Sequence, residues 1–555
     1  RELAEVGTYV GGFSWGGEPT PATTQELGKK SPQAVFELLR DWKAGDDWSS
    51  GTLRGLELAV GDYAATRPDE ALAVGELVIQ NGLRANFLEP IIRGLGRAAE
   101  SGEFAHWADL LRFVSQVVGK ACDEDVHAGE ADAASWREIV DASASVVDEG
   151  CTHDRILPEL QEEVWSVVTR VAQCPLPGAQ FSPELPTSID GILTIALNDT
   201  AGKVARVIVS AALWMYRSIE RDEQSSEEHK DRAKEVVRSK LIPLLDEVMS
   251  LDGRPGMAAQ GMIGHFIPQL HLLVPQWLAE NAERLFTGGA EDPINKPAWG
   301  AYLIRSRVYD TVFQTLRPWY KTAADVAGIN SDLRGADKDR WSPTKSLALH
   351  VLVAFLRGIV SIGDSDHLIE TTFSNVPAKE RGSAYWSIFR GLSDAKEAPS
   401  PDYVARLAQF WEWRLSELDQ SQENEAAEEA IGLGWFLRTP YLPDEVVVRL
   451  GLRTAQLAKG NIELHTDWDR LHELVRTDVD TVFQIAEAVV LAQLRAKYTY
   501  IAVDDVNPLL REVLRSGRAQ TRERVRALIH RLGEHGYVQF GDLLNDGGRS
   551  ESEAQ

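Results

Sequence analysis

Residues 188–217 read SIDGILTIALNDTAGKVARVIVSAALWMYR, and the apolar run near the end of this stretch decides the fold class. Taken alone, VARVIVSAALW would suit a buried strand as well as a helix. Its apolar residues, however, recur at helical intervals: Val204, Val207, Ile208, Ala211 and Met215. Residues at this spacing share one face of an α-helix, whereas a strand turns alternate residues to opposite faces. The stretch therefore predicts a helix.

Gly202 and Lys203 stand at the start of this predicted helix, where they look like the end of a phosphate-binding loop. That motif reads G-x-x-x-x-G-K-[ST] after a strand, because its glycines let backbone N–H groups surround the phosphates and its hydroxyl binds magnesium. In this sequence Leu197 occupies the first glycine position and Val204 follows the lysine. The pattern therefore does not indicate a phosphate-binding loop.

A helix junction explains the same residues. Residues 198–200 (Asn-Asp-Thr) are good N-cap residues, and Gly202 permits the close approach of a neighbouring helix. Lys203 is unusual, because a cation in the first turn opposes the helix macrodipole. We expect Lys203 either to bind Asp190 or Asp199 or to help hold an anion, and it is kept as a candidate partner-binding residue.

Helical spacing continues over almost the whole chain from Gln33 onward. The predicted helices are ~12–20 residues long, end at glycine or proline, and pair off every ~40 residues. The sequence contains no convincing series of alternating strands and no strict repeat consensus. We therefore predict an all-α fold, arranged as an irregular helical-repeat (α-solenoid) array or, as the alternative, as linked helical bundles.

Glycine- and proline-rich stretches indicate the domain boundaries. We expect a linker or irregular segment over residues 1–32, helical regions over 33–175, 187–330 and 341–544, and a disordered tail over 545–555. The chain begins RELAEVG, without an initiator methionine. This start is typical of a processed or trimmed piece of a longer protein, and a catalytic domain would then lie outside the chain.

Composition limits the partners that the chain can bind. Its 555 residues carry a formal net charge of -26, with a pI near 5.0. Such a surface repels nucleic acid and anionic lipid overall, so nucleic-acid binding would require a local basic patch. No apolar run reaches the length of a membrane span, and no leader points to secretion. The three scattered cysteines predict reduced thiols and a cytoplasmic location.

Residue types that bind zinc occur between positions 122 and 174, but their spacing argues against a zinc site. The residues are Cys122, His127, Cys151, His153 and Cys174. A structural zinc site usually contains close pairs such as C-x-x-C, which are absent here. The sequence also lacks an H-E-x-x-H pair and a G-x-S-x-G elbow. We therefore expect no metal, no cofactor and no catalytic residue, and we keep an enzyme with an all-helical pocket as an alternative.

An aromatic stripe is the first candidate for partner binding. Trp299, Tyr302 and Tyr309 recur at helical spacing. Such a stripe is typical of a core seam between repeats. It would also suit an aromatic groove for a partner helix or an unpaired base, provided that the rings are exposed.

An arginine-rich stretch at residues 511–531, REVLRSGRAQTRERVRALIHR, is the second candidate. It contains seven arginines and two acidic residues in a chain that is strongly acidic overall. The stretch indicates either a solvated helix pair that binds acidic neighbours or a patch that binds a phosphate backbone or a partner protein. The arginines are Arg511, Arg515, Arg518, Arg522, Arg524, Arg526 and Arg531.

The order D-x-x-x-x-x-A-x-N-x-x-x-G-K, followed by an apolar helix, resembles a segment of large bacterial anti-phage or conflict-system proteins. It is formed here by Asp190, Ala196, Asn198, Gly202 and Lys203. The C-terminal halves of those proteins are long α-helical regions, often placed behind a sirtuin-like NAD-hydrolysing domain or a signalling NTPase. Four further stretches are similar in order and spacing: SPQAVFELLRDW (31–42), PAWGAYLIRSRVYDTVFQTLRPWY (297–320), FWEWRLSEL (410–418) and LIHRLGEHGYVQFGDLL (528–544).

The resemblance implies recognition or scaffolding, because the shared stretches are packing motifs and carry no catalytic residue. We expect a non-catalytic module that binds a protein partner or a phage-derived trigger and controls an attached or associated effector in bacterial antiviral defence. A helical solenoid that binds nucleic acid through residues 511–531 is the alternative.

Overall fold

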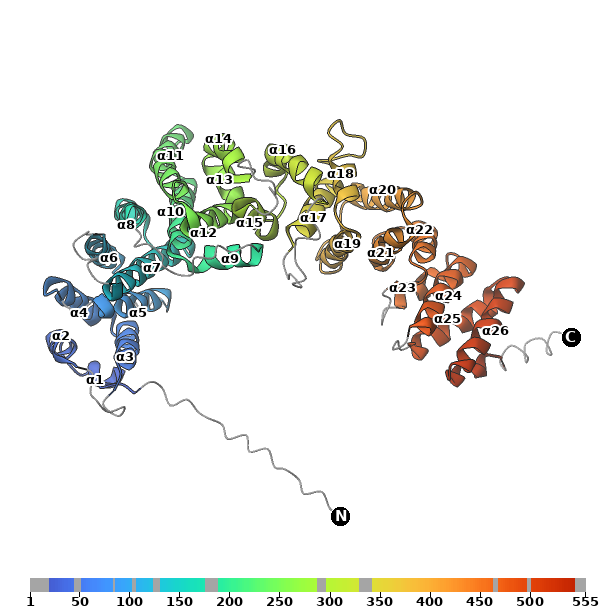
Figure 1. Ribbon diagram of the computed structural model, residues 1–555, viewed down its shortest axis with the longest axis horizontal. Helices are drawn as coiled ribbons and strands as arrows, with labels where there is room; N and C mark the ends of the chain where they lie inside the picture. Colours follow the sequence, from blue (N-terminus) through green and yellow to red (C-terminus); the bar gives the residue numbers. More distant parts are fainter. Residues whose placement is uncertain are drawn as a thin grey trace, which may run out of the picture. The chain divides into compact units, whose positions relative to one another are not determined.

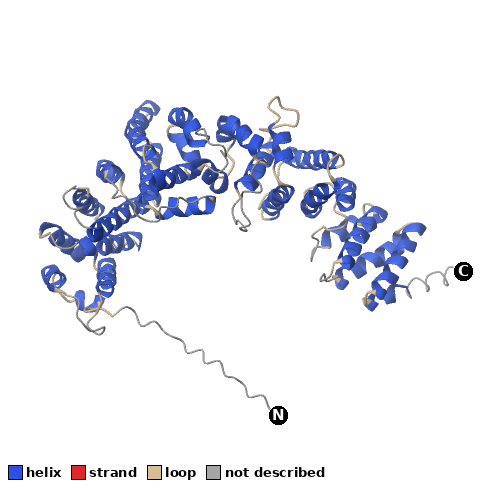
Figure 2. Cartoon of the chain, in the orientation of Figure 1, coloured by secondary structure: helices blue, strands red, loops and turns tan. Residues whose placement is uncertain are grey.

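The computed structural model describes residues 19–43, 51–82, 85–101, 106–122, 130–174, 188–286, 296–328, 342–462, 468–496 and 501–544. Within these ranges every regular element is a helix, and there is no strand (Figure 2). The predicted all-α fold is therefore confirmed. The chain divides into two compact units, residues 1–285 and 286–555.

Helices of the first unit form layers in which each helix packs on the next (Figure 1). One layer contains α1 (Thr24–Leu27), α3 (Leu53–Thr66), α5 (Leu88–Ser101), α7 (Glu130–Thr152), α10 (Thr200–Arg221) and α12 (Gly253–His265). The other contains α2 (Pro32–Asp41), α4 (Pro68–Gln80), α6 (Trp107–Ala121), α8 (Gln161–Gln173) and α11 (Glu227–Met249). The remaining elements are η2 (Ala85–Phe87), η4 (Pro158–Leu160), α9 (Ile189–Asn198), α13 (Ile267–Leu273) and α14 (Pro275–Phe286).

The second unit is also a succession of packed helices. In one row α15 (Pro297–Arg305), α17 (Pro343–Leu356), α19 (Ala378–Ser393) and α21 (Glu423–Leu433) pack in order. In another, α20 (Pro401–Leu418), α22 (Asp444–Leu457), α24 (Val479–Arg495) and α26 (Ala519–Glu534) do the same. The remaining elements are α16 (Asp310–Val326), α18 (Leu368–Asn375), η6 (Gly434–Arg438), α23 (Asp469–Leu474), α25 (Val503–Ser516) and η7 (Val538–Gly541).

Two of the expected regions differ from this arrangement. The expected break between residues 175 and 187 falls inside the first unit, where α10 packs on both α7 and α8. The segment 1–32, expected to be a linker, contains α1 and the start of α2. Thr23 and Glu26 form a capping box at the start of α1, and Leu27 is buried. Local capping and one buried leucine thus fix a helix in a stretch rich in glycine, proline and threonine.

The stretch that predicted the fold forms α9 and α10. All five apolar residues of the periodic set in α10 are buried. Asp199 caps α10, since its side chain accepts a hydrogen bond from the backbone N–H of Ala201 at 3.2 Å. Gly202 lies against α9, and a Cβ atom at this position would overlap the carbonyl oxygen of Ala196. The predicted cap and the predicted close approach of helices are both confirmed.

Replacing Gly202 with valine is expected to lower the free energy of unfolding of the first unit by about 1–3 kcal/mol, because the added atoms must displace the α9 backbone. Urea unfolding followed by hydrogen exchange in α9 and α10 would measure the change. Gly28→Val is the matched control, since a Cβ atom there meets its neighbours at 3.4 Å or more. Equal losses in the two variants would contradict the close contact between α9 and α10.

Candidate functional site

Lys203 connects two helices of the first unit. Its ammonium group lies 2.6 Å from Oδ2 of Asp141 on α7, and the lysine side chain is mostly buried. The sequence-based choice of Asp190 or Asp199 as its partner is corrected, because Asp199 instead caps α10 and pairs with Arg254 at 3.4 Å. Lys203 therefore holds α10 against α7, and it is not an exposed site for a partner.

The predicted aromatic stripe does not form a surface. Trp299 and Tyr302 are 1% and 0% exposed, and the Trp299 ring packs edge-on against Tyr320. Tyr309 is half-exposed, because α15 ends at Arg305 and Tyr309 begins a new helix as the N-cap of α16. The prediction that Trp299 and Tyr302 bind a partner is therefore wrong, because both rings are buried. Their burial fits the alternative, a core seam between helices.

The arginine-rich stretch forms α25, α26 and the junction between them. Three of its seven arginines pair with carboxylates: Arg515 with Glu512, Arg518 with Asp480 and Arg524 with Glu487. Arg522 and Arg526, one turn apart on α26, have no carboxylate partner among the described residues. Glu523 is exposed between them in sequence. Acidic groups are thus interleaved with the arginines, which makes this surface mixed rather than purely basic.

Two of the three cysteines are joined, which corrects the expectation of reduced thiols for them. Cys122 and Cys174 form a disulfide with their Cα atoms 4.8 Å apart, and they stand at the C-caps of α6 and α8. Cys151 is a buried free thiol whose pKa is raised well above the ordinary value by burial. His127 lies outside the described residues. Among the residues that are described, no group of histidine, cysteine and acidic side chains could hold a metal ion.

A groove of about 610 Å³ in the first unit is the strongest candidate site, and we call it the acidic groove. Side chains of three successive helices of one layer, α3, α5 and α7, line it. Among the described residues, six carboxylates and three arginines contribute to the lining. The carboxylates are Glu57, Asp62, Glu89, Glu100, Glu138 and Glu149.

Every arginine of the acidic groove is already paired with a groove carboxylate. Arg54 lies 3.5 Å from Glu57 within α3, and Arg93 pairs with Glu89 within α5. Arg97 of α5 donates to Asp62 of α3 at 2.9 Å and so connects these two helices. The pairing leaves the other three carboxylates without an arginine in the groove.

Those three carboxylates leave the acidic groove with an excess of negative charge. Glu149 faces His153 at 3.1 Å, while Glu100 and Glu138 have no ion-pair partner in the part of the chain that the structure describes. Burial raises the pKa of Glu57 above its ordinary value, Arg54 opposes this rise, and the charges of Glu89 and Glu138 add to it. A cation entering the groove would relieve this repulsion.

The acidic groove also has an apolar surface. Leu58 is 48% exposed, whereas Pro90, Ala142 and Val146, which also line the groove, are themselves buried. The helices can approach closely because α5 contributes glycines: a Cβ atom on Gly94 would overlap the carbonyl oxygen of Gly61 on α3. The groove therefore combines an apolar surface with charged side chains.

Sequence reasoning did not find the acidic groove. Its residues recur at intervals of three and four within each helix, for example Glu138, Ala142, Ser145 and Glu149 on α7. This signal identifies one face of one helix. It does not tell which other helix lies beside that face. The residues on α3, α5 and α7 could be assigned to one groove only from the structure, in which α5 packs on both α3 and α7.

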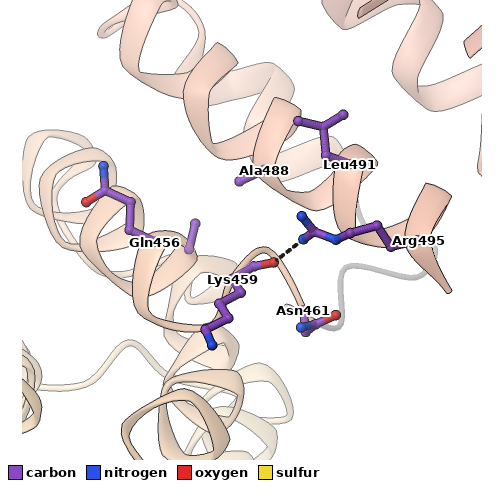
Figure 3. A pocket seen from close by; sticks show the side chains of 7 residues that line it. Gln456, Lys459, Asn461, Ala488, Leu491 and Arg495 are labelled. Carbon is purple, nitrogen blue, oxygen red and sulfur yellow. Dashed lines mark hydrogen bonds between the residues drawn. The ribbon is translucent and has the colours of Figure 1, made fainter. Parts of the chain in front are cut away.

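A smaller depression of about 400 Å³ lies between α22 and α24 in the second unit (Figure 3). It contains two cations, and both are engaged. Arg495 donates to the backbone carbonyl of Lys459 at 2.8 Å, just beyond the C-terminal end of α22. The Lys459 ammonium group lies 2.6 Å from Glu423. These cations neutralise a helix end and a carboxylate, so the acidic groove remains the stronger candidate.

No protein-family model matches the sequence, and no curated protein matches it at a significant level. Among the described residues, no helix is long and apolar enough to cross a membrane. The fold and the groove place the chain in a structural class, that of all-α arrays of packed helices, with a charged groove formed by three helices of one layer.

Proposed function

We propose that this chain is a non-catalytic recognition and scaffold module that binds a protein partner and controls an attached or associated effector. The observation that carries the proposal is the acidic groove, which spans three successive helices of one layer. Stacked helices build extended binding surfaces from side chains that are far apart in sequence. A groove of this kind suits a segment of another protein, which can contact all three helices at once.

We infer that binding in the acidic groove would control the effector through the packing of neighbouring helices. Arg97 and Asp62 connect α5 to α3 inside the groove, and Lys203 and Asp141 connect α7 to α10 beyond it. A partner that binds α3, α5 and α7 together favours the packing in which those helices are correctly spaced. Binding would then also change the packing equilibrium of the helices next to α3, α5 and α7. The proposed setting, bacterial antiviral defence with a phage-derived trigger, rests on the resemblance alone. The expected cytoplasmic location comes from the cysteine pattern, and the disulfide between Cys122 and Cys174 weighs against it.

The two alternatives are less well supported. Binding of nucleic acid through residues 511–531 is opposed by the carboxylates that pair with Arg515, Arg518 and Arg524, and by the net charge of -26. An enzyme with an all-helical pocket would need a nucleophile or a base close to convergent polar groups in a deep pocket. The acidic groove offers instead an open row of carboxylates, three of which are neutralised by arginine.

Affinity purification from the native host, with chemical cross-linking, tests the proposal. The wild-type chain is expected to retain a protein partner, and Glu100→Lys/Glu138→Lys is expected to weaken its binding at least ~10-fold by reversing two groove charges. Glu227→Lys/Glu228→Lys on α11 is the matched control, because both side chains are mostly exposed outside the groove. A partner retained equally by both variants would show that the acidic groove is not the binding site.

A further inference from the structure

The charge balance of the acidic groove identifies the kind of partner segment that it would accept. The three groove arginines are held by Glu57, Asp62 and Glu89. The carboxylates that remain belong to Glu100 on α5 and to Glu138 and Glu149 on α7. An acidic segment or a phosphate group would meet this unneutralised charge, whereas lysine or arginine side chains would complement it.

The spacing of the carboxylates sets the length of that segment. Glu138 and Glu149 lie eleven residues apart on α7, which is about 16 Å along the axis at ~1.5 Å per residue. Glu89 and Glu100 have the same separation on α5, and α5 packs on α7. Each of the two neighbouring helices thus carries a pair of lining carboxylates about 16 Å apart along its axis, and of these four described residues only Glu89 is paired with a groove arginine. A helical segment of about three turns would span this distance with a cation near each end.

Leu58 supplies the second contact. It is one of the large apolar side chains that stay substantially exposed, at 48%, and it lies in the acidic groove on α3. Pro90, Ala142 and Val146 also line the groove, but they are buried, so Leu58 is the most exposed apolar side chain among the described residues of the groove. An apolar side chain of a partner would cover Leu58 and gain burial, while its cations reach the carboxylates.

From these contacts we propose that the acidic groove binds a basic amphipathic segment of the partner protein. Its lysine or arginine side chains pair with Glu100, Glu138 and Glu149, and one of its apolar side chains covers Leu58. This inference rests on the proposed function, since it names the chemistry of the partner for the same groove. A metal ion is a poorer occupant, because no cluster of metal-binding side chains is found among the described residues.

A synthetic peptide of eighteen residues tests the inference directly on the full chain. The probe is a fluorescein-labelled amphipathic helix of lysine and leucine, compared with a scrambled peptide of the same composition. Because the chain carries a net charge of -26, general attraction of cations must be separated from binding in the groove. We expect the amphipathic peptide to bind at least ~10-fold more tightly than the scrambled one in fluorescence anisotropy titrations at physiological salt.

Matched variants locate the bound peptide. Glu100→Gln/Glu138→Gln/Glu149→Gln is expected to weaken binding at least ~10-fold, and Leu58→Ala about 3- to 10-fold. The first control is Glu227→Gln/Glu228→Gln/Asp231→Asn on α11, which removes the same charge from exposed positions. The second is Leu157→Ala, at a leucine that is 62% exposed outside the groove. Both controls should bind within twofold of the wild type, and equal losses in groove and control variants would overturn the inference.

Competition with the native partner separates this inference from the proposed function. If the peptide displaces a partner that was recovered through the acidic groove, both stand. If a partner binds through the groove and the peptide does not displace it, the proposed function holds and the basic amphipathic segment is wrong. If the peptide binds in a groove-dependent way but no partner depends on the groove, the chemistry of the site holds and the proposed function is wrong.

Discussion

Replacing Glu429 with alanine is expected to lower the free energy of unfolding of the second unit by about 3–5 kcal/mol. Glu429 is 0% exposed and lies between two buried guanidinium groups. Its Oε2 lies 2.8 Å from Nε of Arg381, and its Oε1 accepts a hydrogen bond from Nε of Arg414 at 2.8 Å. The Tyr385 hydroxyl also donates to this carboxylate. Removing Glu429 would leave Arg414 and Arg381 buried without their central anion.

Urea unfolding, followed by hydrogen exchange in α19, α20 and α21, would measure this loss, since these helices carry the cluster. The matched control is Glu423→Ala, which breaks the exposed surface pair with Lys459 and should destabilise the unit far less than Glu429→Ala does. Equal destabilisation by the two substitutions would contradict the prediction. It would mean that the buried arginines find other partners and that Glu429 contributes little to the stability of the second unit.

Acid is expected to destabilise the second unit through His350 by about 3 kcal/mol between pH 6.5 and pH 4. His350 is 3% exposed, its Nε2 donates to the Ser306 carbonyl at 3.1 Å, and its Nδ1 lies 2.7 Å from the Tyr320 hydroxyl. Burial lowers the pKa of His350 from 6.5 to about 4, and the hydrogen bond to Ser306 opposes this shift.

The sign of the effect follows from which state binds the proton. Between pH 6.5 and pH 4 the unfolded chain protonates this histidine and the folded chain does not, so the contribution is complete above pH 6.5 and is lost as the pH falls to 4. Unfolding free energies of the second unit at pH 7 and pH 4.5 would measure it. His350→Gln should show a smaller difference between the two pH values. The control His530→Gln, at an exposed position on α26, should have the same unfolding free energy as the wild type at both pH values. If His350→Gln shows the same difference between pH 7 and pH 4.5 as the wild type, His350 is not the source of the acid sensitivity.

The class of fold and the junction at α10 followed from the sequence, because both depend on residues that are close along the chain. The periodic set from Val204 to Met215 fixes one face of α10, and Asp199 caps the same helix. Local spacing also misled in one place. The spacing of Trp299 and Tyr309 predicts one face of a single helix, but α15 ends at Arg305 and Tyr309 is the N-cap of α16. Trp299 is therefore buried, whereas Tyr309 is half-exposed.

Contacts between distant residues could not be predicted in this way. Lys203 pairs with Asp141, 62 residues earlier, although carboxylates stand nearer to it in sequence. The acidic groove also depends on contacts between distant residues, since α3, α5 and α7 each supply lining residues and are separated along the chain by α4 and α6. Periodicity assigns a residue to a face, whereas the partner of that face depends on how helices of the whole unit pack.

The disulfide between Cys122 and Cys174 closes a covalent ring, and its two cysteines have a sequence separation of 52. A protease that cuts any single peptide bond inside this ring opens it without releasing a fragment, because the sulfur bridge still joins the two pieces. A nicked chain would therefore migrate as one species on a non-reducing gel and as two after reduction. The ring includes the whole of α7, so a single cut within it would leave Glu138 and Glu149 in the same covalently joined molecule as the rest of the acidic groove.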